Sequence, residues 1–470
     1  MIKKRTHPGR RLLVAVLIML TALNGTGSLP VAHAQDRDAA YQEALDRIQA
    51  AKETGATTLD LSGLGLVELP PEIGQLTNLK MLILQDNALT VLPPEIGQLT
   101  NLQELVLAGN SLDANVAYQE ALARIQDAKN TSATELYFTG LGLAKLPPEI
   151  WQLTNLQVLD LRWNALTSLP PEIGQLANLQ RLDLACNGLT NLPPEIGQLT
   201  NLKTLDLRGN ALTSLPAEIW RLTNLQVLDL RWNDLASLPP EIGRLASLRE
   251  LGLSELASLP PEIGQLTNLQ TLDMKTMYLT SLPPEIGQLT NLQVLFLSSR
   301  MTLTSVPPEI GQLINLQTLV LWGGVLTSLP PEIWQLTNLQ TLNLMSNDLT
   351  SLPPEIGQLA NLQTLNLDGN ALISLPSEMG QLTNLQSLDL SGNALTSLPP
   401  KIGQLTHLQT LGLSDNSLTR LPPELGHLTH LEWLDLDGNP LESPPLDIVE
   451  QGTEAIFEYL REQLESAGSE

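Results

Sequence analysis

The sequence has a single cysteine, Cys186, among its 470 residues. An intrachain disulfide is therefore impossible, and the chain must obtain its stability from packing. A lone thiol is more often an inert filler than a nucleophile, so we assign Cys186 no catalytic role.

Positive charge is also scarce. Lysine and arginine number 25 against 50 aspartates and glutamates, which gives a formal net charge of −25 at pH 7. Proteins that bind nucleic acid neutralise phosphates with basic side chains, so we expect no nucleic-acid partner. We interpret the acidity as a surface charge that keeps the protein soluble.

Long hydrophobic runs are absent except near the N-terminus. Residues 1–34 contain five basic and no acidic residues, then the apolar run LLVAVLIML (Leu12–Leu20), then the tripeptide AHA that ends at Ala34. This order is typical of a secretory signal peptide, and it predicts a mature chain that begins at Gln35 and is secreted or held in the cell envelope. The run is too short for an ordinary membrane span, and we expect no span after signal removal. An uncleaved N-terminal anchor is the alternative.

What the sequence has in abundance is one repeated unit. From Leu146 onward it reads LPPEIGQLTNLQxLxLxxNxLTS with a period of 23 residues. Its L-x-L part alternates apolar and polar residues, as a short strand does. The two prolines cannot lie inside a sheet, so PPEIGQL is predicted to cross to the other side as an irregular or tight-helical segment. One unit cannot bury its leucines alone, so stacked units must share a continuous core.

The motif L-x-x-L-x-L-x-x-N-x-L, with LPPEIGQLTNL between its copies, resembles leucine-rich repeat proteins. By texture it is similar to the 23-residue class found in Ras-associated repeat proteins and bacterial Roco GTPases. The resemblance implies an α/β solenoid (horseshoe) with a parallel sheet on its concave face and short helical or irregular convex segments. It also implies that the asparagine of each unit bonds the turn backbone as an internal ladder. No G-x-x-x-x-G-K-[ST] phosphate loop occurs, so GTP binding is not expected.

Two nearly identical segments interrupt the 23-residue period. AYQEALDRIQAAKETGATTLDL begins at Ala40 and AYQEALARIQDAKNTSATELYF at Ala117, and each predicts an amphipathic helix that caps a strand. The short connection at 114–116 favours one continuous solenoid, with two separate arrays as the alternative. The predicted organisation is a signal peptide (1–34), an N-terminal cap helix (35–55), first repeats (56–113), an internal duplicated cap-like helix (114–132), a main repeat array (133–442) and a C-terminal cap helix (443–470).

Four consecutive units lack the ladder asparagine. The segment Glu250–Ser258 is two residues short, Leu295–Ser305 has one extra residue, and Met277 and Gly324 replace the asparagine in the other two. Each lost hydrogen-bond partner is worth about 1 kcal/mol, which predicts that Glu250–Thr327 is the softest interior part of the array. Drift in a redundant array and a specialised binding segment both explain the pattern.

No arrangement of residues suited to catalysis, cofactor binding or metal binding is found. His407 and His430 lie one repeat apart and could share a transition metal, but single Asn-to-His changes in GQLTNLQ explain both and no further ligand completes a site. Some bacterial secreted repeat proteins are ubiquitin ligases, which carry a separate catalytic domain with a nucleophilic cysteine, and we find no equivalent here. We therefore expect a protein that is not an enzyme.

Charged and aromatic side chains recur at strand positions that should point into the concave face. An aspartate occupies the middle of four successive L-x-L triplets, where like charges about 5 Å apart call for counter-charges. Arginines lie two residues away, and two copies of LDLRWN add tryptophans. A self-satisfied lattice of salt bridges is one interpretation. The other is a partner-binding hot spot made of Asp160, Arg162, Trp163, Arg181, Asp206, Arg208, Asp229, Arg231 and Trp232.

Three other tryptophans, Trp151, Trp220 and Trp334, replace the glycine of PPEIGQL and are predicted to cover the core.

Taken together, the sequence predicts an exported, non-enzymatic protein that recognises an unknown protein partner, or acts as a scaffold, through its concave face. An architectural envelope or surface component is one alternative. A cytosolic regulatory protein derived from a Roco-type repeat region is the other.

Overall fold

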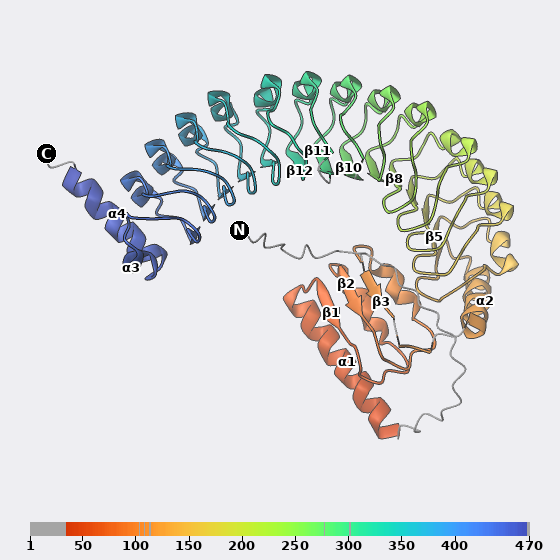
Figure 1. Cartoon of the computed structure of the whole chain (residues 1–470). Helices are drawn as coiled ribbons and strands as arrows, with labels where there is room; N and C mark the ends of the chain where they lie inside the picture. The colour runs from red at the N-terminus through yellow and green to blue at the C-terminus, as the bar shows by residue number, and fades with distance from the viewer. Residues whose placement is uncertain are drawn as a thin grey trace, which may run out of the picture. The chain divides into compact units, whose positions relative to one another are not determined.

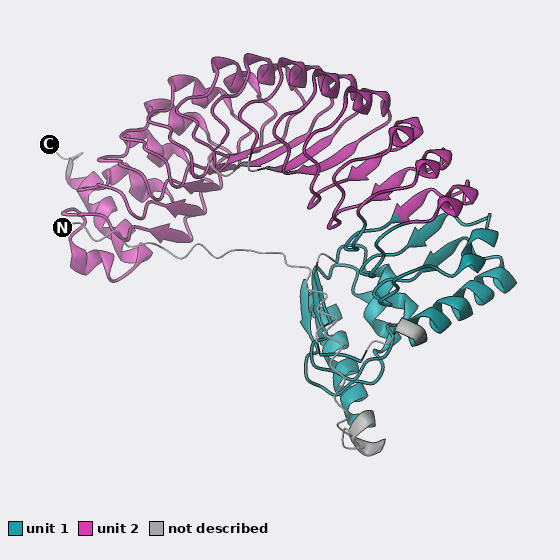
Figure 2. Ribbon diagram, turned by 45° about the vertical axis from the view of Figure 1, so that its right-hand side comes forward, with its two compact units in different colours: residues 1–168, 183–189 teal, residues 169–182, 190–470 magenta. Residues whose placement is uncertain are grey.

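The computed structural model describes residues 34–102, 104–107, 109–111, 114–276, 278–299 and 302–467. The expected signal peptide lies outside the described residues, apart from Ala34, and so does Met277. The chain divides into two compact units, residues 1–168 with 183–189 and residues 169–182 with 190–470, coloured separately in Figure 2.

Each repeat contributes a short strand and a short 3-10 helix. The L-x-L motif forms the strand, and most 3-10 helices begin at the second proline of PPEIGQ, as η4 (Pro171–Gln175) does. Proline suits this position because the first N–H of a helix has no partner within the helix. The helix ends where the N–H of Leu176 donates to the carbonyl of Ile173 at 3.1 Å. The predicted tight-helical crossing is therefore confirmed.

Unit 1 contains two long helices and the first strands of the chain. β1, β2 and β3 form a three-stranded parallel sheet, and β4 pairs in parallel with β5. Its elements are α1 (Ala34–Thr54), β1 (Thr58–Asp60), η1 (Pro71–Gln75), β2 (Met81–Ile83), η2 (Pro94–Gln98), β3 (Glu104–Val106), α2 (Ala114–Thr131), β4 (Glu135–Tyr137), η3 (Pro148–Gln152) and β5 (Val158–Asp160).

Unit 2 repeats strand and 3-10 helix until two C-terminal α-helices end it. After η4 come β6 (Arg181–Asp183), η5 (Pro194–Gln198), β7 (Thr204–Asp206), η6 (Ala217–Arg221), β8 (Val227–Asp229), η7 (Pro240–Arg244), β9 (Glu250–Ser254), η8 (Pro261–Gln265), β10 (Thr271–Thr276), η9 (Pro284–Gln288), β11 (Val294–Ser299), η10 (Pro308–Gln312), β12 (Thr318–Trp322), η11 (Pro331–Gln335), β13 (Thr341–Asn343), η12 (Pro354–Gln358), β14 (Thr364–Asn366), η13 (Ser377–Gln381), β15 (Ser387–Asp389), η14 (Pro400–Gln404), β16 (Thr410–Gly412), η15 (Pro423–His427), β17 (Trp433–Asp435), α3 (Leu446–Val449) and α4 (Thr453–Ala467).

The strands form two sheets. β4 to β17 follow one another in chain order in a sheet of 14 strands, which confirms the predicted solenoid with a parallel sheet, whereas β1 to β3 form a sheet of their own. The favoured interpretation of one continuous solenoid is therefore wrong, and the alternative of two arrays is correct. The reason is α2, which occupies the chain between β3 and β4 where the regular spacing would add another repeat.

The two duplicated segments form helices that pack on the following strand in the same way. Arg47 in α1 donates to the carbonyl of Asp60 at 3.2 Å, and Arg124 in α2 donates to the carbonyl of Tyr137 at 2.9 Å. The buried faces of the two helices also match: Ala44, Ile48 and Ala51 in α1 correspond to Ala121, Ile125 and Ala128 in α2. Figure 1 shows α1 beside β1. Each helix therefore covers the first strand of an array, as an array with an exposed apolar end requires.

The core of the repeats is a stack of buried leucines and isoleucines, held at the turns by the asparagine ladder. In unit 2, Asn416 accepts a hydrogen bond from the N–H of Leu395 at 3.0 Å and donates to the carbonyls of Leu390 and Leu413 at 2.9 and 3.1 Å. The internal ladder implied by the family resemblance is thus confirmed. Trp151, Trp220 and Trp334 are buried over the repeats, as predicted.

The four units without the asparagine have longer strands. β10 and β11 share six paired positions, from Thr271 opposite Val294 to Thr276 opposite Ser299, whereas the regular pair β14 and β15 shares three. Backbone pairing replaces the missing side chain: the N–H of Glu255, for example, donates to the carbonyl of Lys275 at 2.9 Å. The expectation that these turn groups simply lose a partner is therefore wrong.

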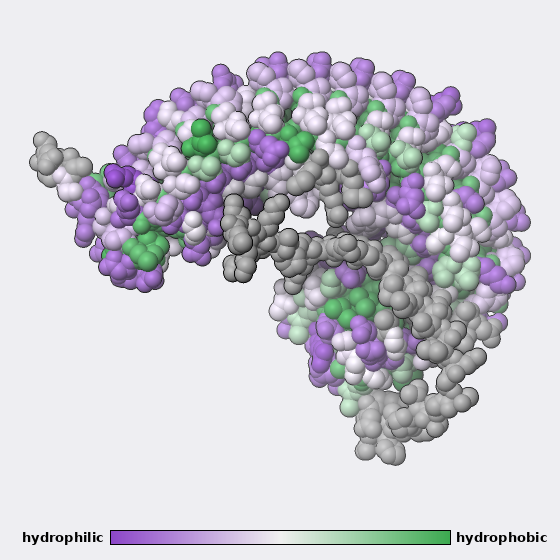
Figure 3. Space-filling view, in the orientation of Figure 1, coloured by the Kyte–Doolittle hydropathy of each residue, from purple (hydrophilic) through white to green (hydrophobic). Residues whose placement is uncertain are grey.

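Within unit 2, the strands line the inner side of a curved array and the 3-10 helices lie on its outer side (Figure 2). Hydrophilic side chains dominate that outer rim (Figure 3). In the part of the chain that the structure describes, no helix is both long and apolar enough to cross a membrane.

Candidate recognition surface

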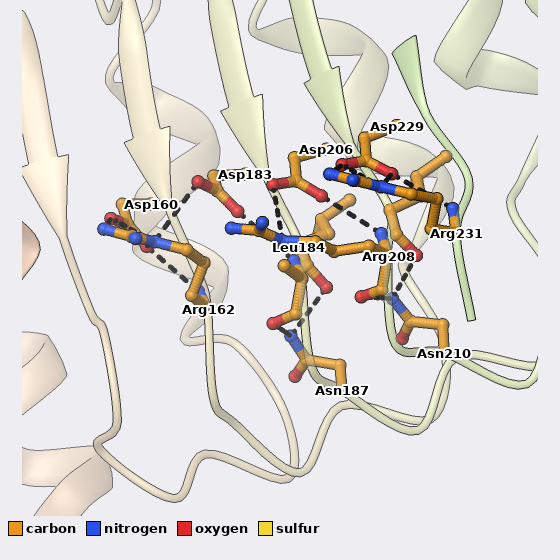
Figure 4. A network of polar contacts seen from close by, with 12 residues as sticks. Asp160, Arg162, Asp183, Leu184, Asn187, Asp206, Arg208, Asn210, Asp229 and Arg231 are labelled. Carbon is orange, nitrogen blue, oxygen red and sulfur yellow. Dashed lines mark hydrogen bonds and ion pairs between the residues drawn. The ribbon is translucent and has the colours of Figure 1, made fainter. Parts of the chain in front are cut away.

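In unit 1, the first Asp-x-Arg group is an enclosed ion cluster. The guanidinium of Arg162 contacts the carboxylate of Asp160 at 2.6 Å and that of Asp183 at 3.2 Å, and all three side chains are buried (Figure 4). Asp160 also accepts a hydrogen bond from the backbone N–H of Arg162 at 3.0 Å, which fixes the turn after β5. Opposite charges withdrawn from water in this way must be fully paired to be tolerated.

Arg162 also bonds the backbone of the first array. It donates to the carbonyl of Gly97 at 3.1 Å and to that of Leu99 at 3.3 Å, both at the end of η2. Trp163 is 9% exposed and belongs to one hydrophobic cluster with the leucines of the first array, such as Leu102. The structure therefore places Asp160, Arg162 and Trp163 inside unit 1, not on the open surface that the sequence analysis expected.

In unit 2, arginines pair with aspartates of the same repeat, and one also reaches an aspartate two strands away. Arg208 contacts Asp206 at 3.1 Å, and Arg231 contacts Asp229 (Figure 4). Arg231 also contacts Asp273. Burial lowers the pKa of Arg231, but its bonds to the two carboxylates outweigh this and hold the pKa above the ordinary arginine value. These residues thus form salt bridges with one another, and their part in binding a partner stays a prediction.

Among the members of the expected hot spot in unit 2, Asp229 is buried, whereas the others keep some exposure: Arg181, Asp206, Arg208, Arg231 and Trp232. Trp232 is half-buried, with the guanidinium of Arg231 at 5.9 Å and the ammonium of Lys275 at 5.4 Å from its ring centroid. Such cation–π contacts hold the ring in place. Arg181 is half-buried in β6.

An apolar strip on the sheet face of β11 to β13 was missed by the sequence analysis. It consists of Phe296, Val320, Trp322 and Met345, which occupy positions where neighbouring strands carry Asp, Asn, Lys or Ser. Phe296 lies opposite Val320 in register, and Trp322 is 42% exposed. The signal was present in the sequence as apolar residues at the polar positions of the L-x-L-x motif.

An acidic end follows the apolar strip on the same face. It consists of Asp368, Asp389, Asp415, Asp435 and Asp437. No lysine or arginine occurs in β13 to β17 or in the three residues after each of these strands. Desolvation raises the pKa of Asp368 above its ordinary value, and the negative charges of Asp389 and Asp415 raise it further. These carboxylates thus lack the counter-charges that the arginines supply near β7 and β8.

Family models match most of the repeats. A leucine-rich repeat region model matches residues 240–324, a leucine-rich repeat model matches 177–235, 314–372 and 383–441, and a two-copy leucine-rich repeat model matches 77–116 and 154–195. A solved leucine-rich repeat protein from Leptospira interrogans is 42% identical, with 86% of this chain and 96% of that chain covered and a TM-score of 0.63. The chain belongs to the leucine-rich repeat family.

More distant leucine-rich repeat structures share the fold. An internalin from Listeria monocytogenes is 22% identical over 71% of this chain and 91% of its own, with a TM-score of 0.53. Toll in the Toll–Spätzle complex from Drosophila is 22% identical over 82% of this chain and 57% of its own, also with a TM-score of 0.53. A search of curated protein sequences gave no match.

The two histidines belong to a second ladder of this leucine-rich repeat array, on the side away from the core. The asparagine of LTNLQ reaches the carbonyl 24 residues earlier, as Asn384 does to Ala360 at 2.8 Å. His407 and His430 make the same contact through Nδ1, at 2.9 Å to Thr383 and Thr406. Their rings stack, with centroids 6.4 Å apart and planes 16° from parallel. The histidines therefore replace asparagine, as the sequence analysis preferred.

Proposed function

We propose that this leucine-rich repeat protein is exported and binds a protein partner through the inner sheet face of unit 2, without catalysing a reaction. Solenoids of this family present extended inner surfaces that commonly serve protein recognition. The mature chain starting at Gln35 is supported by the residue order of segment 1–34 alone.

The observation that carries this proposal is the apolar strip. The repeat needs its buried leucines, but it does not need Phe296 or Trp322, because Asp, Asn or Ser occupy the same positions in other strands. Aromatic side chains on a rigid sheet supply large contact area at low entropy cost, which is why they dominate binding hot spots. An architectural component that only spaces or coats has no use for them there.

Affinity capture tests the proposal with one variant and one matched control. Residues 35–470 serve as bait for the extracytoplasmic fraction of the native host, beside Trp322→Ser and Ile314→Thr. Ile314 is 59% exposed in the turn after η10, where other repeats have threonine, so this change also removes an exposed apolar side chain but off the sheet face. We expect a discrete captured protein that Trp322→Ser loses and Ile314→Thr retains. Equal capture by both variants would contradict recognition by this face.

The export of the protein is tested by a separate measurement. N-terminal sequencing of the protein from its native host should give Gln35 as the first residue. An intact segment 1–34 on a cytosolic protein would favour the regulatory alternative instead.

A further inference from the structure

The order of side chains along the inner face of unit 2 indicates which chemistry a partner needs. Going from β11 to β17, the apolar strip comes first and the acidic end follows, with Asn343 and Asn366 between them. Register fixes this order: Val320 lies opposite Asn343, Asn343 opposite Asn366, and Asn366 opposite Asp389. The apolar strip and the acidic end are therefore adjacent on one rigid sheet.

The carboxylates of the acidic end differ from Asp206 and Asp229 because no arginine of the same repeat pairs with them. Asp229 and Asp206 are bound by arginines two residues away, but serine follows Asp389 at the equivalent position and a second aspartate follows Asp435. Asp389 accepts one hydrogen bond, from the N–H of Ser391 at 3.1 Å, which leaves its charge uncompensated. A row of like charges on adjacent strands costs free energy unless a cation neutralises it.

We propose that the sheet face of β11 to β15 binds a polypeptide segment of the partner in which an apolar or aromatic side chain is followed within a few residues by lysine or arginine. This inference rests on the proposed function and specifies its partner. The apolar side chain packs on Phe296, Trp322 and Met345, and the basic one pairs with Asp368 and Asp389.

The spacing follows from the strand geometry. β12 and β14 are two strands apart, hence about 10 Å, which an extended chain that crosses the strands covers in about three residues. The basic side chain also explains specificity, because an acidic segment would meet the uncompensated carboxylates of the acidic end and be repelled.

Two synthetic 12-residue peptides test this chemistry directly. Both alternate phenylalanine and leucine with charged residues, which are lysine in one peptide and glutamate in the other, and fluorescence anisotropy measures their binding to residues 35–470. We expect the lysine peptide to bind at least about tenfold more tightly, with an affinity that falls as salt rises. Equal binding, or no binding of either peptide to the wild type, overturns the proposal.

Variants separate this site from the general acidity of the protein. Asp368→Asn with Asp389→Asn should weaken the lysine peptide about fivefold. The fold tolerates the second change, because Asn366 already accepts the equivalent backbone hydrogen bond, from Asp368 N–H at 2.9 Å. Glu355→Gln with Glu378→Gln removes the same charge from η12 and η13 on the outer side and should have little effect. Trp322→Ser should weaken the lysine peptide at least about tenfold.

If the two double variants weaken the lysine peptide equally, the attraction is unspecific and the proposal is wrong. The peptide test and the capture experiment can also fail separately. Capture of a native partner that depends on Trp322, without a preference for the lysine peptide, leaves recognition by this face intact and refutes only the basic character of the partner.

Discussion

Arg162 donates a hydrogen bond to the carbonyl oxygen of Gly97, 3.1 Å away, although 65 residues separate the two in the sequence. The contact joins the turn after β5 to the end of η2. Tyr137 packs so closely on Gly97 that no Cβ fits there. The open end of the first array is thus covered by side chains from β4 and from the turn after β5, where an ordinary array would have another repeat or a cap.

This relationship predicts a large stability effect at Arg162. Arg162→Ala leaves the buried carboxylates of Asp160 and Asp183 without their partner, which should cost about 3–5 kcal/mol. The matched control is Arg208→Ala, whose ion pair with Asp206 is part-exposed and worth about 1 kcal/mol or less. Urea unfolding measures both. Similar losses for the two variants would show that burial of the Arg162 ion cluster does not increase the cost of removing its arginine.

The two tryptophans of the LDLRWN motifs should behave differently. Trp163 is buried in the cluster that joins the first array, so Trp163→Ala should cost about 3–5 kcal/mol of stability. Trp232 is half-buried beside Lys275, so Trp232→Ala should cost about 1 kcal/mol. Thermal unfolding compares them. Equal destabilisation would mean that the two copies of the motif share one role.

The sequence was sufficient for the repeat, because a 23-residue period with leucine, proline and asparagine at fixed positions leaves one stacking solution. It also located the helix that begins the second array. It could not show that Arg162 and Trp163 are buried, since their motif is identical to that of Arg231 and Trp232. The difference arises from which part of the chain packs on each copy, a contact between segments about 65 residues apart that no local pattern encodes.

The segment without the asparagine ladder provides a test of backbone pairing. The sequence alone predicted that Glu250–Thr327 opens most easily, but the longer ladders of β9 to β12 supply additional backbone hydrogen bonds. We therefore expect amide hydrogen exchange in β10 and β11 to be at least as slow as in β14 and β15. Faster exchange throughout β10 and β11 would instead support the sequence-based prediction that this segment opens most easily.

The acidic end predicts a pH-dependent gain in stability from Asp368→Asn. The pKa of Asp368 is raised above 3.8 in the folded protein, chiefly by desolvation and then by Asp389, so the folded state favours the protonated carboxyl. Its ionisation therefore costs stability as the pH rises from below 3.8 through the folded pKa. The variant should raise Tm by about 1 °C at pH 7 and not at pH 3. Calorimetry at both values checks this, and an equal shift at both would exclude an electrostatic origin.

The central claim, that the inner sheet face of unit 2 is occupied by a partner, is tested most directly by hydroxyl-radical footprinting of this protein in the native extracytoplasmic fraction. Mass spectrometry would compare the oxidation of Trp322 and Met345 there with that of the purified protein. We expect both residues to be protected in the fraction while exposed side chains off the sheet face, such as Ile314, react equally in the two samples. Unchanged oxidation of Trp322 and Met345, or protection confined to Ile314, would contradict the account.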